Sequence, residues 1–167
     1  MSPELLGHLL DHHAAALVLY ARQWCRAPED IVQEAFLKLV RQRPPPEKPV
    51  PWLYRVVRNE AVSAARAAQR RRRHETAAAA QRPAWFVPSR GGALDAEAAA
   101  AALQSLPPEQ REAIVAHLWG GLTFDQIGEL TGTSSSTAHR WYLAGLSTLR
   151  MRFHEPCPDP KNFPSRT

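Results

Sequence analysis

Apolar residues at helical spacing, interrupted by prolines and glycines, are the feature that most limits the folds open to this chain. In segment 5–26, leucines and aromatic residues recur three or four positions apart, and segment 29–42, EDIVQEAFLKLVRQ, carries Ile31, Phe36 and Leu39 on one helical face. Alternation with a period of two never persists, and β-branched residues are sparse. The sequence therefore predicts an all-α protein.

The prolines indicate where these helices begin and end. Pro28 stands where a first-turn proline is tolerated, directly before segment 29–42. The next prolines predict a stiff, extended loop, with a new helix starting directly after the last of them; they are at positions 44, 45, 46, 49 and 51. Farther along, Pro107 and Pro108 open a helix over 108–119, and a Gly-Gly pair closes it.

The chain is expected to form two small helical domains, 5–75 and 94–153. Between them, helical periodicity fails and alanines, prolines and glycines mix, which predicts a flexible linker over 76–93. The last residues, 154–167, are rich in proline and are expected to be disordered. Domains of this size are near the lower limit for independent stability, so we expect binding to a larger partner to stabilise them.

Positive charge is concentrated in one stretch, 52–75, which holds seven arginines and two glutamates. This surplus equals the formal net charge of the whole chain, +5, because acidic and basic side chains balance in 1–51 and in 76–167. Such localisation indicates one docking place for a polyanion, nucleic acid above all. Two other interpretations stay open: a solvated helix face whose basic end complements the helix dipole, and attraction to an anionic membrane surface.

On a helix, the basic stretch has two unlike faces. The apolar face would pack on a small core and consists of Leu53, Val56, Val57, Ala61, Ala64 and Ala68. The opposite face consists of Trp52, Arg55, Asn59, Arg66, Arg70 and Arg73. Arginines contact phosphates, an asparagine can pair with a base edge, and an aromatic ring can stack on an unpaired base. We therefore expect the second face to bind DNA.

Segment 123–150 has the signature of a helix-turn-helix. Phe124, Ile127 and Leu130 are the inward positions of a short first helix. Gly132 permits the tight turn, and Ser134 can cap the second helix. The outer face of the second helix, where a recognition helix meets base edges in the major groove, consists of Ser135, Ser136, His139, Arg140 and Leu143. An ordinary helical hairpin used only for packing is the alternative.

Several other classes of protein are disfavoured. No apolar run reaches the roughly 18 residues of a membrane span, and the first residues lack a cleavable signal, so we expect a cytoplasmic protein without membrane insertion. Cys25 and Cys157 lack the spacing of a zinc site or a disulfide framework. Asp11, His12 and His13 are adjacent and point to different helix faces. We therefore predict no catalytic residue, no metal and no cofactor, and do not expect an enzyme.

The two halves together resemble a known family. Region 2 of bacterial RNA polymerase sigma factors, of the sigma-70 family, is similar to the run EDIVQEAFLKLV, a loop, WLYRVVRN and an arginine-rich end. Region 4 is similar to LPPEQREAIVAHLWGGLTFDQIGEL, a serine-rich turn and TAHRWYLAGLSTLR. The order, the short linker and the lack of a region 3 domain resemble the extracytoplasmic-function (ECF) type. The resemblance covers roughly residues 10–153 and implies promoter recognition, DNA melting and transcription initiation.

The resemblance also implies roles for matching residues. Contacts to the clamp helices of the polymerase β′ subunit would come from Asp30, Gln33, Glu34 and Leu37. Trp52, Arg55 and Asn59 would capture the non-template strand of the minus-ten element and hold a flipped base. The helix-turn-helix would read the minus-thirty-five element and contact the polymerase β flap, and the linker would run through the RNA exit path. Whether an anti-sigma factor is a further partner stays open.

Two other functions compete with this interpretation. A transcriptional regulator whose helix-turn-helix acts without polymerase would explain segment 123–150 and leave EDIVQEAFLKLV and WLYRVVRN unexplained. An arginine-rich module that binds structured RNA would explain only the basic stretch. Stoichiometric binding of core polymerase by the full chain would separate the sigma factor from both.

Charge predicts that the helix-turn-helix binds DNA weakly by itself. From Pro107 to Phe153, four arginines face four acidic residues, and Ala144 occupies a position that is commonly basic in the family. Since phosphate contacts supply much of the affinity for duplex DNA, fragment 93–153 should act mainly when it is tethered to polymerase. Titration of the fragment with promoter duplex at physiological salt measures this; specific binding with submicromolar affinity would contradict it.

Overall fold

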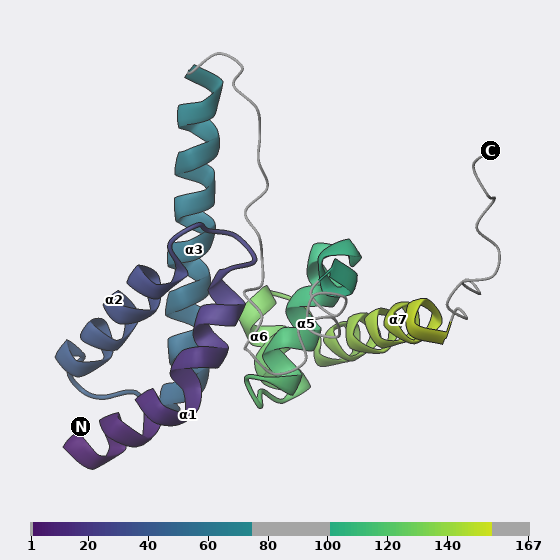
Figure 1. Ribbon diagram of the computed structural model, residues 1–167. Helices are drawn as coiled ribbons and strands as arrows, with labels where there is room; N and C mark the ends of the chain where they lie inside the picture. The colour runs from purple at the N-terminus through teal and green to yellow at the C-terminus, as the bar shows by residue number, and fades with distance from the viewer. Residues whose placement is uncertain (1, 75–100, 155–167) are drawn as a thin grey trace, which may run out of the picture.

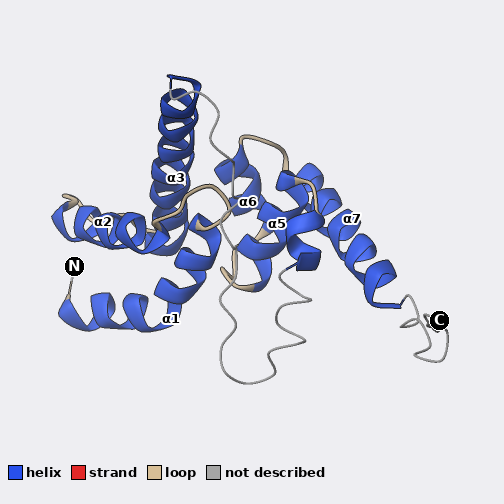
Figure 2. Cartoon of the chain, turned by 45° about the horizontal axis from the view of Figure 1, so that its top comes forward, coloured by secondary structure: helices blue, strands red, loops and turns tan. Residues whose placement is uncertain are grey.

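The computed structural model describes residues 2–74 and 101–154, and both ranges are helical (Figure 1). The helices are α1 (Pro3–Ala21), α2 (Pro28–Arg41), α3 (Pro49–His74), α5 (Pro108–Leu118), α6 (Phe124–Thr131) and α7 (Ser135–His154). Residues 101–105 are also helical. No strand occurs in the described part of the chain (Figure 2), so the predicted all-α fold is confirmed. We call 2–74 the N-terminal region and 101–154 the C-terminal region.

Local sequence signals set most helix boundaries. The Ser2 hydroxyl caps α1 by accepting a hydrogen bond from the Leu5 amide at 3.3 Å. Pro28 begins α2 as predicted. The prediction for α3 is wrong by most of a turn, because the helix begins at Pro49 and not after Pro51. Both prolines are tolerated there, since amides in the first turn have no intrahelical acceptor.

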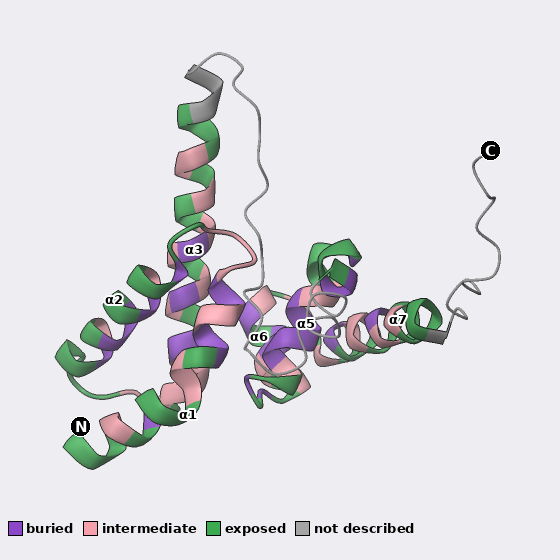
Figure 3. Cartoon of the chain, in the orientation of Figure 1, coloured by how far each residue is buried: buried purple, intermediate pink, exposed green. Residues whose placement is uncertain are grey.

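The N-terminal region is a three-helix arrangement in which each helix contacts the other two. Its fully buried side chains include Leu17 of α1, Leu39 of α2 and Leu53 of α3. The predicted apolar face of α3 is confirmed at Leu53, Val57 and Ala61, whereas Val56 and Ala68 are half-buried and Ala64 is exposed. The second half of α3 therefore extends beyond the core, as Figure 3 shows.

The C-terminal region packs α5 and α6 against α7. Thr123 and Gln126 form a reciprocal capping box at the start of α6, and Gly132 ends the helix in a left-handed conformation with φ 74°. The Ser134 hydroxyl accepts from the Thr137 amide at 3.2 Å and so caps α7. Ile127 and Leu130 are buried and Phe124 is half-buried. The predicted helix-turn-helix is thus present in its expected local geometry.

The two regions share one core. Buried residues from both form a single contiguous apolar cluster, in which α1 contacts α5 and α3 contacts α6. Figure 3 shows this burial at the junction of α1, α3, α5 and α6. We expected each small domain to need a larger binding partner for stability, but in the structure each region packs against the other. The predicted linker 76–93, Cys157 and the tail beyond His154 lie outside the described residues.

Two glycine-to-alanine changes test the packing of the helix-turn-helix. A Cβ at Gly128 would lie 2.8 Å from the Thr133 carbonyl oxygen and 3.1 Å from the Ser135 nitrogen, both in backbone that cannot move without opening the turn. Gly128→Ala should lower the free energy of unfolding by about 1–3 kcal/mol. Gly7→Ala in α1 meets nothing within 4 Å and should raise it by up to about 1 kcal/mol, because alanine favours helix.

Urea unfolding of the full-length variants, followed by circular dichroism, measures both changes. If Gly128→Ala were as stable as Gly7→Ala, the close approach of α6 to the turn would be refuted.

Candidate nucleic-acid interface

Helix α3 presents most of the predicted minus-ten residues on one exposed stripe. Arg55, Asn59, Arg66 and Arg70 are all exposed, and their spacing puts them on one side of the helix. We call these four residues the arginine stripe. Because the second half of α3 projects beyond the body (Figure 1), Arg66 and Arg70 are presented without a neighbouring helix over them. Arg73 is in the last turn of α3, where side chains lie outside the described residues.

Trp52 is less exposed than predicted for an aromatic ring that is free to stack on a base. Its side chain is half-buried and packs against the core, as the side chain of Val50 does. The first turn of α3 packs against the core that α3 forms with α1 and α2, so a side chain there is partly shielded from solvent. Part of the indole remains accessible, and a stacked base would meet its exposed part.

The arginines of α3 differ in what they already contact. Arg58 forms an ion pair with Glu112 of α5, with Nε 2.7 Å from Oε1. Arg55 lies 3.7 Å from Glu129 of α6, in a pair whose side chains are 55% and 70% exposed. Arg66, Arg70 and Arg71 are exposed and have no ion pair within the described ranges. These three guanidinium groups are therefore the readiest to meet phosphates.

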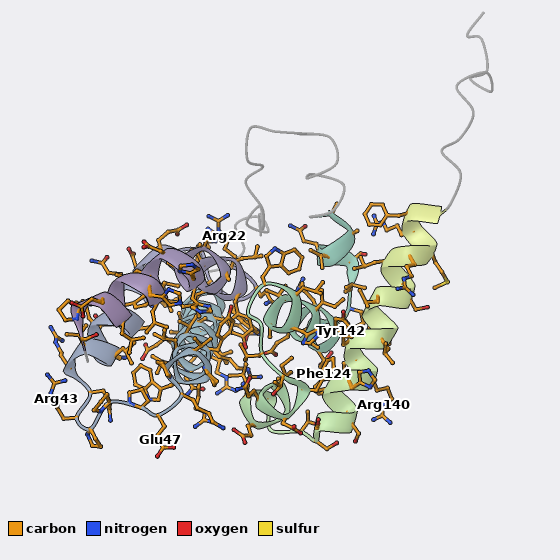
Figure 4. The ribbon with its side chains drawn as sticks, turned by 90° about the horizontal axis from the view of Figure 1, so that it is seen from below. Arg22, Arg43, Glu47, Phe124, Arg140 and Tyr142 are labelled. Atoms are coloured by element: carbon orange, nitrogen blue, oxygen red, sulfur yellow. The ribbon has the colours of Figure 1, made fainter. Side chains whose placement is uncertain are left out.

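Helix α7, which we predicted to be a recognition helix, carries a second exposed set of residues. Ser136, His139, Arg140 and Leu143 are exposed, whereas Ser135 is half-buried at the start of the helix. Figure 4 shows Arg140 at the outer edge of α7 and Phe124 and Tyr142 on its inner side. The predicted outer face is therefore exposed at four of its five positions.

An aromatic cluster that the sequence pattern did not reveal fixes α7 on α5 and α6. His117 of α5 stacks on Phe124 with ring centroids 4.5 Å apart, and its edge meets Tyr142 at 4.9 Å. The His117 Nδ1 lies 2.8 Å from the Leu122 carbonyl oxygen. His139, which we predicted to lie on the outer face of α7, also contacts this cluster, with its ring centroid 4.7 Å from that of Phe124. The cluster thus holds in place one residue that was predicted to contact bases.

Helix α2 exposes the residues that were predicted to bind polymerase. Asp30, Gln33, Glu34 and Leu37 are exposed, and Leu37 is 40% accessible although it is apolar. Beside them, a mainly apolar groove of ≈ 400 Å³ runs between α1 and α2. It is lined by Leu6, Leu10, Ala14, Val18, Val32, Phe36, Leu37 and Val40, together with the polar residues Glu29 and Gln33. An acidic and apolar face of this kind suits a protein partner better than DNA.

Nothing in the described ranges suggests a metal site or a membrane segment. Those residues contain no group of three or more His, Cys, Asp or Glu side chains that could hold a metal ion. Among the described helices, none combines the length and the apolar character that crossing a bilayer requires. Cys25 is a free, half-buried thiol, and burial raises its pKa.

The structure is an all-helical protein with two packed regions and with exposed polar faces on α2, α3 and α7. The family model "Sigma-70 region 2" matches residues 9–71, and the model "Sigma-70, region 4" matches residues 96–149. The RNA polymerase sigma factor CarQ of Myxococcus xanthus is 35% identical over 125 residues, which are 73% of this chain and 72% of that protein. The chain belongs to the sigma-70 family of RNA polymerase sigma factors and is of the ECF type.

A solved structure has the same fold. The sigma factor RpoE of Bartonella quintana, determined in complex with the anti-sigma factor NepR, matches with a TM-score of 0.73 and 21% sequence identity. The match covers 93% of this chain and 100% of that one.

Removing the unpaired arginines should change how DNA binding depends on salt. Each phosphate contact adds about 0.9 to the magnitude of the log–log slope of affinity against salt for duplex DNA. Replacement of Arg66, Arg70 and Arg71 by alanine should therefore lower that magnitude by up to about 2.7. Fluorescence anisotropy of the full chain with a labelled duplex between 50 and 200 mM salt, about the range over which such affinities fall steeply, measures the slope.

Arg41→Ala, at the exposed end of α2, is the matched control and should leave the slope nearly unchanged. A slope that is equal in the triple variant and in wild type would contradict phosphate binding by the projecting part of α3.

Proposed function

We propose that this protein binds core RNA polymerase and directs it to promoters, where it recognises the minus-ten and minus-thirty-five elements, assists DNA melting and starts transcription. The observation that carries the proposal is the separation of three exposed faces on one chain. An acidic and apolar face lies on α2, the arginine stripe on α3 and a recognition face on α7. Membership of the ECF sigma factors supports the same combination.

The face of α2 is proposed to bind the clamp helices of the β′ subunit. Its Asp30, Gln33, Glu34 and Leu37 follow helical spacing, so one partner surface can meet all four. The exposed Leu37 beside the apolar groove supplies area to bury, and Asp30 and Glu34 supply charge that selects a basic partner. The C-terminal region is proposed to contact the β flap as well as DNA.

The stripe on α3 is proposed to hold melted DNA at its first half and duplex at its second half. Trp52, Arg55 and Asn59 combine an aromatic ring, a cation and an amide within two helical turns, which is what an unstacked base requires. Arg66 and Arg70 continue along the same side and suit the phosphates of the adjoining duplex. On α7, Ser136, His139 and Arg140 are proposed to read the minus-thirty-five element.

A regulator that acts without polymerase remains the second possibility from sequence. It is disfavoured because the region 2 match over 9–71 and the exposed face of α2 would then have no role.

Run-off transcription with purified core polymerase on a promoter library tests the function and reports the DNA sequence that is read. The full chain should form a stoichiometric complex with core polymerase and direct specific initiation. Asp30→Lys combined with Glu34→Lys should weaken core binding at least tenfold, because two attractive charges become repulsive. Asp11→Lys, exposed on α1, is the control for charge reversal and should bind core normally.

Binding of core polymerase without initiation on any promoter would refute the proposed role in initiation. Tight sequence-specific binding to duplex DNA without polymerase would support the regulator instead.

A further inference from the structure

One large apolar side chain is exposed on the otherwise polar outer face of α7. Leu143 is 51% exposed, and the other exposed residues of the predicted face, Ser136, His139 and Arg140, are polar. His139 and Arg140 precede Leu143 by four and three residues, so the three side chains share one side of the helix. The polar residues of this face have a proposed role in reading DNA, whereas Leu143 has none so far.

The packing of α7 keeps Leu143 on the outside. The preceding residue, Tyr142, points inward (Figure 4), where its ring centroid lies 5.4 Å from that of Phe124. On the other side, Gly145 is buried against α5, and a Cβ added there would lie 2.6 Å from Ile114 Cδ1. Because residues on both sides of Leu143 are packed in the core, α7 cannot rotate to bury it. The side chain is therefore presented to solvent in a fixed direction.

The neighbours of Leu143 allow a flat surface to approach it. Ala144 and Ser147 are exposed on the same side of α7 and have small side chains. Toward the start of the helix, Arg140 Nη2 donates a hydrogen bond to the Thr137 hydroxyl at 3.4 Å, which holds the guanidinium group near the first turn. The outer face thus presents a cation first and, one turn farther along, an apolar side chain without a bulky neighbour.

The major groove of DNA offers one apolar group to such a side chain, the C5 methyl of thymine. The other base edges there present hydrogen-bond donors and acceptors. A leucine pressed against those edges would displace water without replacing its hydrogen bonds, which costs affinity. Leu143 has neither a donor nor an acceptor, so among the bases it gains most against thymine. Burial of one methyl group corresponds to about fourfold in affinity.

Base contacts carry more weight in the C-terminal region because its charge is balanced. From Pro107 to Phe153 the four arginines are matched by four acidic residues, so phosphate attraction contributes little. Arg140 suits a guanine, with which arginine forms two hydrogen bonds in the major groove. The helix rises about 4.5 Å from Arg140 to Leu143, against about 3.4 Å between stacked bases. The two side chains therefore meet base pairs one or two steps apart.

A protein partner is the other use for an exposed leucine, and the surroundings of Leu143 favour DNA. The core of a protein interface is a contiguous apolar area depleted of charge, whereas Leu143 lies among polar and small side chains. The other exposed large apolar side chains of α7 in the described part of the chain are Met151 and Phe153. Both lie more than two helical turns farther along, so they do not extend Leu143 into an apolar patch.

We propose that Leu143 determines specificity by packing on the methyl group of a thymine in the minus-thirty-five element, one or two base pairs from a guanine that Arg140 binds. This proposal rests on the proposed function, because α7 must lie in the major groove of that element. It adds the identity of two bases to that function. A promoter that this protein reads should therefore carry a guanine and a nearby thymine where α7 binds.

Exchange of thymine for deoxyuridine removes only this methyl group and so isolates the contact. Each thymine of the minus-thirty-five element in a selected promoter is exchanged in turn, and the two templates compete for the full chain with core polymerase in one run-off reaction. Wild type should favour thymine about fourfold at one position. Leu143→Ala, whose side chain is too short to reach, should show no preference there, whereas Leu143→Met should keep it. Met151→Ala, exposed on the same helix, is the matched control and should match wild type.

The outcomes separate this contact from the proposed function. Loss of the methyl preference in Leu143→Ala, with Leu143→Met and the control like wild type, supports the contact. A preference that survives in Leu143→Ala, or none at any position in wild type, overturns it. Weaker binding of core polymerase by Leu143→Ala, with the methyl preference unchanged, would assign Leu143 to a protein partner and overturn it too. If no template is transcribed, the role in initiation is refuted, and duplexes that the full chain selects from a random library then compete for it by fluorescence anisotropy at low salt, which decides the contact separately.

Discussion

Each half of this chain has only a small core by itself, and the rest of the structure follows from that constraint. A domain of about 60 residues buries only about 60% of the surface that its unfolded chain exposes, so its stability is marginal. Here the two halves place their apolar residues in one contiguous cluster, with α1 against α5 and α3 against α6. Packing that stabilises the fold therefore also sets the relative position of the two faces that we propose to bind DNA.

Apolar burial and the hydrogen-bonded triad of Glu112, Tyr20 and Arg58 make different contributions to that contact. Removal of apolar area from water is non-directional and tolerates small rotations of one region on the other. A carboxylate shared between Tyr20 and Arg58 contributes little net stability, because the cost of desolvation offsets most of the attraction. It nevertheless penalises every arrangement in which one of the three groups loses its partners. The apolar cluster thus favours association of the regions, and the triad selects one orientation.

Sequence was a good guide to local structure and a poor one to the contact between the regions. The boundaries of α2 and α5, the glycine at the turn and the cap at Ser134 followed from proline, glycine and hydroxyl residues at recognisable positions. The helical region predicted over 5–26 is shifted, because α1 spans Pro3–Ala21. The exposed residues of α2 came from the family resemblance, and the outer face of α7, apart from the half-buried Ser135, followed from helical spacing. The roles of Tyr54, Arg58 and Glu112 in the contact between the regions were not predicted, because in sequence each resembles an ordinary partly exposed helix residue. The hydrogen-bond partners of Glu112 are up to 92 residues away along the chain. Trp52 was placed on the free face because a helical wheel does not show which turn meets the core.

The projecting half of α3 shows how a helix can be presented without packing. Isolated helical segments of this length are marginal in water, and the four consecutive arginines from Arg70 to Arg73 repel one another. Alanine has the highest helix propensity of all residues, and it fills positions 64, 65, 67 and 68 between the arginines. The same small side chains leave a hollow of ≈ 650 Å³ against the residues that join α1 to α2, instead of the packed face that their pattern predicted. Intrinsic propensity thus replaces burial along these turns, so Arg66 and Arg70 extend away from the core on a continuous helix.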